Sequence, residues 1–88
     1  MLNEMKYVYE VYKEKSFSKA AKKLFISQPA LSNMVRKAEK EMGAPIFDRS
    51  TIPLTVTKEG AYYICTVEKI LFLERNLERY FQDIAGLQ

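Results

Sequence analysis

The stretch that decides the fold is residues 16–32, which read SFSKAAKKLFISQPALS. Ser18 is placed to cap a short helix that runs to about Leu24, because its hydroxyl accepts a hydrogen bond from a free backbone N–H of the first turn. Ser27 is placed to cap a second helix, with Pro29 in the first turn, where a missing N–H costs nothing. Two short helices joined by a tight turn predict a helix-turn-helix.

Helical patterns continue on both sides of this stretch. Upstream, apolar residues at spacings of three and four predict an amphipathic helix over residues 2–14. Downstream, the second helix of the pair continues to about residue 42, where Gly43 followed by Pro45 ends it. Its predicted buried stripe consists of Leu31, Val35, Ala38 and Met42.

A small β-hairpin and a long helix make up the rest of the chain. Residues 46–47 and 54–56 are brief β-prone runs, and the segment between them forms a wing-like loop. Thr57 is placed to cap a last helix over residues 58–85, which Gly86 ends. At about 1.5 Å per residue this helix is roughly 42 Å long, so most of it must project from a body this small.

The projecting helix carries an apolar seam. Its apolar residues alternate spacings of three and four, as in a helix that pairs with another helix. No other segment is left to cover them, so a second copy of the chain is the simplest partner. We therefore divide the chain into a winged helix-turn-helix, residues 1–57, and a linker and dimerisation helix, residues 58–88. The seam residues are Ile70, Leu73, Leu77, Tyr80, Ile84 and Leu87.

Positive charge is concentrated in the first half of the chain. The whole chain has 14 Lys and Arg residues against 11 Asp and Glu residues, a net charge of +3. Residues 13–40 hold eight basic and two acidic side chains, whereas residues 58–88 hold four basic and five acidic ones. A local excess of this kind attracts polyanions, of which nucleic acid is the commonest inside cells. The alternative is a solvated lysine face that keeps the protein soluble.

The composition excludes most enzyme chemistry. With no His and one Cys, the chain cannot build a Cys/His zinc site, an internal disulfide or an imidazole acid–base pair. No nucleophile has a recognisable base and no glycine-rich loop could hold a phosphate, so we expect no enzyme activity, cofactor, metal or small-molecule site. Cys65 is expected to be a small buried residue rather than a redox sensor.

The sequence gives no sign of membrane association. Its apolar runs are interrupted long before the roughly 20 residues needed to cross a bilayer. The first residues include the charged side chains Glu4 and Lys6 and do not have the pattern of a signal peptide. We therefore expect a cytoplasmic protein without membrane contact.

The exposed face of the second helix of the pair suits DNA bases. In a helix-turn-helix this helix enters the major groove, where paired donors and acceptors read base edges. Gln28 and Asn33 offer such pairs, Ser32 donates or accepts, and Pro29 fits the methyl group of thymine. Nearby cations are placed to hold phosphates, namely Arg36, Lys37 and at least one of Lys19, Lys22 and Lys23. The alternative is a structural helical hairpin whose polar face contacts only water.

These residues resemble the N-terminal DNA-binding region of the LysR-type transcriptional regulators. The resemblance covers nearly the whole chain and is most specific in the run SQPALS at the start of the third helix. It implies a mainly α fold, a winged helix-turn-helix of three helices and a small β-hairpin wing, followed by a long linker helix through which two copies dimerise in antiparallel fashion. The matching runs are residues 16–24, 26–32, 39–43, 47–49 and 54–60.

The resemblance also implies partners and site residues. The partner is double-stranded DNA with an interrupted palindromic operator near a regulated promoter, bound by a homodimer that in a full-length protein can form a tetramer. The base contacts implied are Gln28, Pro29, Ser32 and Asn33. The residues implied at phosphates or in the wing are Ser18, Lys19, Ser27, Arg36, Lys37, Arg49, Ser50 and Thr51.

The chain departs from the family pattern in the third helix and in the wing. Asn33 stands where the family usually has Arg, and Met34 where a polar residue usually follows, which predicts an unusual base preference. Ile52 and Pro53 stand about where the wing often has a second basic residue, which predicts a weaker electrostatic grip. Family members also carry a large C-terminal domain that senses a small molecule. The sequence ends at Gln88, so both a piece of a longer regulator and a stand-alone module stay open.

Two functions from different classes fit these residues. The first is sequence-specific DNA binding by a dimeric bacterial transcription regulator. The second is a winged-helix module for protein interaction or dimerisation, in which the long helix is the working part and the basic face is incidental. Salt dependence separates them, because binding through phosphates weakens steeply as salt rises.

Overall fold

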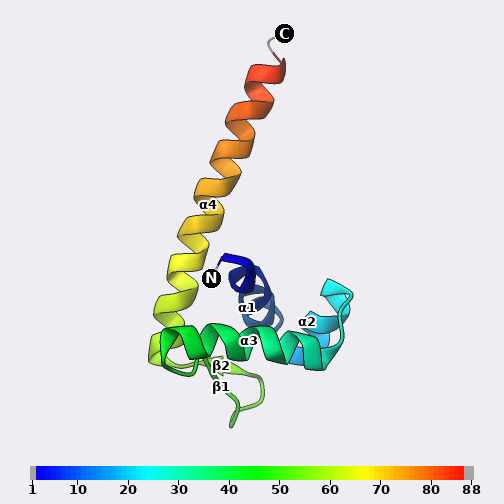
Figure 1. Cartoon of the computed structure of the whole chain (residues 1–88), viewed down its shortest axis with the longest axis vertical. Coiled ribbons are helices and arrows are strands. Elements are labelled where there is room, and N and C mark those ends of the chain that lie inside the picture. The colour runs from blue at the N-terminus through cyan, green and yellow to red at the C-terminus, as the bar shows by residue number, and fades with distance from the viewer. Residues whose placement is uncertain (1, 87–88) are drawn as a thin grey trace.

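The computed structural model describes residues 2–86, which fold into four helices and a two-stranded antiparallel sheet. Three helices and the sheet form a body from which the fourth helix projects, giving an elongated molecule of 53 × 26 × 21 Å (Figure 1). The mainly α fold with a hairpin and a long last helix confirms the fold class expected from the sequence. The elements are α1 (Leu2–Glu14), α2 (Phe17–Leu24), α3 (Gln28–Met42), β1 (Phe47–Asp48), β2 (Thr55–Val56) and α4 (Lys58–Gly86).

Serine side chains fix the starts of α2 and α3. Ser16 caps α2, since its hydroxyl accepts a hydrogen bond of 3.2 Å from the backbone N–H of Lys19. The prediction that Ser18 is this cap is wrong, because α2 begins one residue before Ser18, whose hydroxyl lies 3.1 Å from that of Ser16. The Ser27 cap of α3 is confirmed, with its hydroxyl 3.2 Å from the backbone nitrogen of Ala30.

Residues in the left-handed conformation end both helices. Phe25 ends α2 at φ 58°, and its backbone N–H donates to the carbonyl of Lys22 at 3.2 Å. Gly43 ends α3 at φ 77°, a conformation that glycine adopts without steric cost, and its N–H donates to the carbonyl of Glu39 at 2.8 Å. These turns set the directions in which the chain enters and leaves α3.

The apolar core joins α1, α3 and α4. Val8 of α1, Leu31 and Val35 of α3, Ile46 before β1 and Val67 of α4 are almost completely buried. The first turns of α4 therefore belong to the body, and only its later turns project.

Two side chains expected in the core lie on the surface. Cys65 is exposed, because it points away from the face of α4 on which Ile64 and Val67 are buried. Met42 is 41% exposed, because α3 ends there and the chain turns away at Gly43. Met42 follows the helical spacing of the buried stripe but lies at its end.

The hairpin between α3 and α4 is short. Its two strands pair antiparallel, with Phe47 opposite Val56 and Asp48 opposite Thr55. Phe47 is buried, and its ring meets that of Phe17 edge to face with 5.9 Å between the ring centroids. This aromatic contact ties the hairpin to the start of α2.

Thr57 joins the hairpin region to α4. Its hydroxyl accepts a hydrogen bond of 2.9 Å from the N–H of Gly60, which confirms Thr57 as the cap of α4. The same hydroxyl donates to the carbonyl of Pro45 at 2.6 Å, and the Thr57 N–H donates to the carbonyl of Ile46 at 2.9 Å. The chain that follows α3 and the start of α4 are therefore held together.

The second half of α4 projects from the body, as expected (Figure 1). Ile70 and Leu71 are partly buried against the core, and residues 72–86 are exposed. Among them are four residues of the predicted seam, Leu73, Leu77, Tyr80 and Ile84, whose exposed fractions range from 37% to 65%. The sixth seam residue, Leu87, lies outside the described residues. Across residues 2–86, no helix has the length and apolar character that would let it span a membrane.

Gly60 leaves no room for a side chain, because a Cβ there would overlap the carbonyl of Ile46. Gly60→Ala should therefore lower the free energy of unfolding by about 1–3 kcal/mol, the usual cost of overpacking. Urea unfolding followed by circular dichroism measures this change. Gly86→Ala is the matched control, because a Cβ there meets no atom within 4 Å. It should leave the midpoint unchanged or slightly higher, and equal midpoints for the two variants would contradict the close approach.

Candidate nucleic-acid interface

The first turns of α3 present a polar face to solvent. Gln28, Pro29 and Asn33 are exposed and Ser32 is partly exposed, whereas Leu31 on the opposite side is completely buried. The four predicted base-contact residues therefore lie together on one face of one helix, and the core holds that helix from behind.

Asn33 and Arg36 contact each other on this face. The Nη1 atom of Arg36 donates to the Oδ1 atom of Asn33 over 3.5 Å, a long and therefore weak hydrogen bond. The contact places the guanidinium beside the predicted base-contact residues, and a bond this weak is easily exchanged for one to DNA.

Lys37 lies beside a buried carboxylate. Its Nζ atom is 3.0 Å from the Oε1 atom of Glu4, whose side chain is 4% exposed. The hydrogen bond from Lys37 lowers the pKa of Glu4 to about 2, and the same bond raises the pKa of Lys37. This pair joins the start of α1 to the middle of α3. Sequence reasoning missed Glu4, although its place four residues before Val8 puts it on the buried stripe of α1.

A second buried carboxylate, Glu10, gathers lysines beside α2. Lys13 and Lys23 place their Nζ atoms 3.1 Å and 3.2 Å from its two oxygens. Burial raises the pKa of Glu10, but the hydrogen bonds from Lys13 and Lys23 outweigh it, and the pKa lies below its ordinary value. Of the three lysines of α2, Lys23 therefore has its positive charge balanced by an ion pair with Glu10. Lys19 and Lys22 are exposed, and no ion pair joins them to the rest of residues 2–86.

Arg49 at the base of the wing is held between α2 and α3. Its Nη2 atom lies 3.4 Å from the Oε1 atom of Glu39, and its guanidinium carbon is 4.8 Å from the ring centroid of Phe17. The other carboxylate oxygen of Glu39 accepts a 2.7 Å hydrogen bond from the N–H of Ile46. Glu39, which sequence reasoning did not single out, therefore fixes both the wing and the chain that leads into it.

The polar residues of the wing loop bond within the hairpin. The hydroxyl and the N–H of Ser50 donate to the carboxylate of Asp48, which lowers the pKa of Asp48. The hydroxyls of Thr51 and Thr55 lie 3.0 Å apart. These bonds give the loop a fixed shape.

The predicted site residues gather in three places. The first is the exposed face of α3, and the second is the paired starts of α2 and α3, where Ser18 and Ser27 are exposed. The third is the wing. Figure 1 shows α3 and the hairpin loop at the end of the molecule opposite the projecting end of α4.

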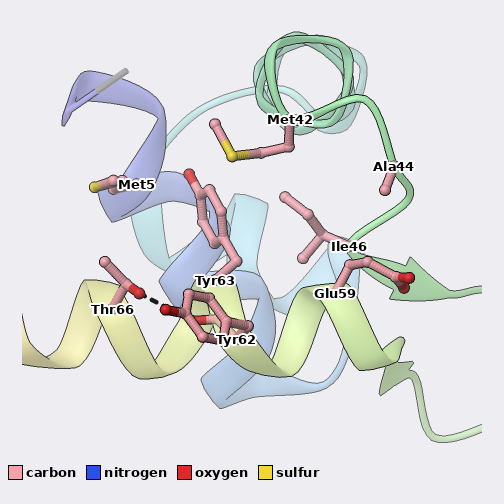
Figure 2. Close-up of a pocket in the computed structure, with 8 residues that line it drawn as sticks. All are labelled: Met5, Met42, Ala44, Ile46, Glu59, Tyr62, Tyr63 and Thr66. Atoms are coloured by element: carbon pink, nitrogen blue, oxygen red, sulfur yellow. Dashed lines mark hydrogen bonds between the residues drawn. The ribbon is translucent and has the colours of Figure 1, made fainter.

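An apolar groove between α1, α3 and α4 lies apart from these residues. It holds about 450 Å³ and is lined by residues that include Met5, Met42 and Tyr62 (Figure 2). The hydroxyl of Thr66 donates to the carbonyl of Tyr62 at 3.1 Å, and burial raises the pKa of Tyr63 to about 12. Within the described part of the chain, no group of three or more His, Cys, Asp or Glu residues could hold a metal ion.

Comparison with known proteins agrees with this arrangement. The family model described as "Bacterial regulatory helix-turn-helix protein, lysR family" matches residues 2–61. The chain is 33% identical over 87 residues to the probable RuBisCO transcriptional regulator of Gracilaria tenuistipitata var. liui, covering 99% of this chain and 28% of that protein. It is 37% identical over 70 residues to the HTH-type transcriptional regulator BenM of Acinetobacter baylyi, covering 80% of this chain and 23% of that protein. The chain thus spans less than a third of the length of these relatives.

Solved structures share the fold. A crystal structure of the BenM DNA-binding domain in complex with benA site 1 DNA matches with a TM-score of 0.88 and 33% identity, covering 97% of this chain and 96% of that chain. A crystal structure of full-length BenM matches with a TM-score of 0.78 and 33% identity, covering 93% of this chain and 26% of that chain. The match to the isolated domain includes the long last helix, because it covers nearly all of both chains.

Glu4→Gln should lower stability at neutral pH and reduce the acid sensitivity of the fold. The pKa of Glu4 is about 2 in the folded chain against an ordinary 4.5, so the ionised carboxylate stabilises the fold above about pH 4.5. That contribution is lost as the pH falls toward 2. The difference in Tm between the parent and Glu4→Gln should therefore shrink over this range.

Thermal unfolding followed by circular dichroism at a series of pH values measures the difference. Glu78→Gln, on the exposed part of α4, is the control and should follow the parent at every pH. A gap between the parent and Glu4→Gln that stays constant down to the lowest pH would show that the Glu4–Lys37 pair does not stabilise the fold.

Proposed function

The chain belongs to the LysR family of bacterial helix-turn-helix regulators, and we propose that it binds a specific operator as a dimer, with α3 in the major groove. It is a DNA-binding domain whose relatives are transcriptional regulators and not enzymes. The observation that carries the proposal is the exposed face on the first turns of α3, formed by Gln28, Pro29, Ser32 and Asn33. A dimer repeats this face by two-fold symmetry, which fits an interrupted palindrome.

Each side chain on this face has a partner among the base edges. The amides of Gln28 and Asn33 fit the donor and acceptor that adenine presents in the major groove. Ser32 accepts or donates a single hydrogen bond, and Pro29 packs on the methyl group of thymine. An amide at position 33 favours adenine, whereas the arginine usual in the family would favour guanine.

Phosphate contacts surround this face in the proposed complex. The N-terminus of α3 carries the positive end of the helix dipole, which attracts an anion, and Ser27 at that end is exposed. Lys37 and Arg49 already contact Glu4 and Glu39, so each gains less from a phosphate than an unpaired cation would. The residues proposed at phosphates or beside the wing are Ser18, Lys19, Ser27, Arg36, Lys37, Arg49, Ser50 and Thr51.

The projecting half of α4 is the proposed dimer contact. Leu73, Leu77 and Tyr80 are 58–65% exposed along one side of the helix, a continuous apolar surface that water does not favour. Antiparallel pairing of two such helices covers the seam and places two copies of α3 on one side of the duplex. In this scheme residues 1–57 contact DNA and residues 58–88 join the two copies, with seam positions Ile70, Leu73, Leu77, Tyr80 and Ile84.

The exposed face of α4 also fits a second function, a winged-helix module that binds or dimerises with proteins without reading DNA. Fluorescence anisotropy separates the two functions, using a duplex selected from a random pool by the parent chain and an unselected duplex at two salt concentrations. Sequence-specific groove binding predicts a preference for the selected duplex and a steep loss of affinity with salt. The protein module predicts no enrichment of any duplex.

Gln28→Ala and Ser32→Ala should reduce the preference for the selected duplex while leaving binding to unselected DNA nearly intact. Base contacts carry discrimination of about 1–3 kcal/mol each, whereas phosphate contacts act on every sequence alike. Lys40→Ala, an exposed position near the other end of α3, is the control and should keep the preference. Equal losses on both duplexes would show that these side chains do not face the bases.

Leu77→Glu should give monomers that remain helical. In the proposed dimer, Leu77 packs against the partner helix, where an unpaired charge is costly, whereas in a lone helix it faces water. Sedimentation should show half the mass of the parent, and binding to the full selected duplex should weaken more than binding to one half-site. Arg79→Glu changes the charge on a side of α4 that points away from the seam and should stay dimeric. A dimeric Leu77→Glu variant would refute the proposed contact.

A further inference from the structure

One flank of the α4 seam carries two opposite charges. Lys69 and Asp83 lie fourteen residues apart, which is two heptads, so both have the same position relative to the seam. Both are exposed, and neither forms an ion pair within residues 2–86. Asn76 lies midway between them on the same flank. Two such helices running in opposite directions can therefore bring the acid of one copy level with the base of the other.

We propose that two copies of α4 pair in the register, or alignment along the helix axis, that sets Leu73 opposite the partner's Leu77. This inference rests on the proposed dimer and adds to it the alignment of the two helices. In this register Lys69 faces the partner's Asp83, and two-fold symmetry repeats the pair at the other end. Charges on the flanks of a seam select among the registers that apolar layers allow.

The apolar layers fit this register. Ile70 lies opposite the partner's Tyr80, and Thr66 lies opposite the partner's Ile84. Thr66 lines the apolar groove of about 450 Å³ between α1, α3 and α4, and Tyr62 beside it is 79% exposed (Figure 2). The end of the partner's α4 therefore covers apolar surface that a single chain leaves open to water.

The neighbouring registers fit less well. A shift of one heptad toward the body would set Tyr63 opposite the partner's Tyr80, but Tyr63 is 7% exposed and packs in its own core. It would also press the partner's Ile84 against the charged Glu59. A shift the other way would set Leu73 opposite the partner's Ile84 and leave the groove open. Either shift separates the opposite charges on the flank by about 10 Å along the helix.

The other flank of the seam carries a like charge that the body offsets. Glu74 lies opposite the partner's Glu74 in the proposed register. In each chain, the Nζ atom of Lys6 in α1 is 3.6 Å from the Oε1 atom of Glu74. Each carboxylate thus has a cation beside it, which reduces the repulsion between the two copies.

Disulfide trapping tests the register, because two Cys residues bridge only when their Cα atoms lie within about 7 Å. Cys65 is exposed, so every variant also carries Cys65→Ser. A chain with Thr66→Cys and Ile84→Cys should form a covalent dimer in a glutathione buffer, seen as twice the mass on a non-reducing gel. Within one chain these two positions lie about 27 Å apart along α4, so the bridge must join two copies.

Two matched chains report the shifted registers. Leu73→Cys with Ile84→Cys would bridge only after the shift away from the body, and Thr66→Cys with Leu77→Cys only after the shift toward it. Neither should form a covalent dimer. A covalent dimer of either chain without one of the first chain would overturn the inference, and so would the absence of a covalent dimer in all three.

Charge reversal tests the flank pair. Lys69→Asp should weaken the dimer about threefold to tenfold at low salt, since it replaces two attractive contacts by two repulsive ones, and the effect should shrink as salt rises. Adding Asp83→Lys should restore the parent affinity within about twofold. Arg79→Asp, on a side of α4 that points away from the seam, is the control and should dimerise as the parent does. Sedimentation measures each affinity, and equal weakening by the single and the double variant would contradict the pair.

Sedimentation of the parent separates this inference from the proposed function. A dimeric parent that is trapped in a shifted register would keep the proposed dimer and overturn only the alignment. A parent that stays monomeric at every concentration would overturn both.

Discussion

The backbone of Ile46 is held from both sides, and the relative placement of α3, the wing and α4 depends on it. Its N–H donates to the carboxylate of Glu39 in α3 at 2.7 Å, and its carbonyl accepts from the N–H of Thr57 at 2.9 Å. Gly60 then brings α4 so close to that carbonyl that no side chain fits between them. The Ile46 side chain is 1% exposed, so these bonds lie at the edge of the core, where electrostatic interactions are stronger than in water. The three elements that meet DNA or a second copy in the proposed complex are thus joined at one residue.

Carboxylates in the body decide which positive charges stay available. Glu4 engages Lys37, and Glu39 engages Arg49, so a count of basic residues overstates the charge that a polyanion would meet. The side chain of Glu4 is 4% exposed, so removing Lys37 takes away the strongest interaction that keeps this carboxylate ionised, which destabilises the fold. These cations therefore help to hold α3 and the wing in place within the folded chain. Lys19, at the start of α2, is exposed and forms no ion pair within residues 2–86, so its charge is accessible to a polyanion.

Local signals in the sequence predict most of the fold, and tertiary contacts account for the misses. Periodicity and caps identify every helix, because both depend on residues within a few positions of each other. Ser16 and Ser18 are equally good caps by sequence, and the packing of Phe17 on a residue of the distant hairpin favours the earlier start. The face of α3 that forms the candidate site follows from spacing alone. Its fixation by Glu4 and Lys37 does not, because the two residues lie on different helices.

Attachment of the first turns of α4 to the core fixes the direction of its projecting half relative to α3. Tyr63, Ile64 and Val67 anchor the first turns of α4 in the core, and the helix continues without a break to Gly86. The direction of the seam around Leu73 is therefore fixed relative to α3, since each residue of a helix turns by a constant angle. In the proposed dimer, two-fold pairing of α4 then sets the distance and angle between the two copies of α3. The spacing of operator half-sites becomes a property of the folded body and its long helix, where a flexible linker would have left it undefined.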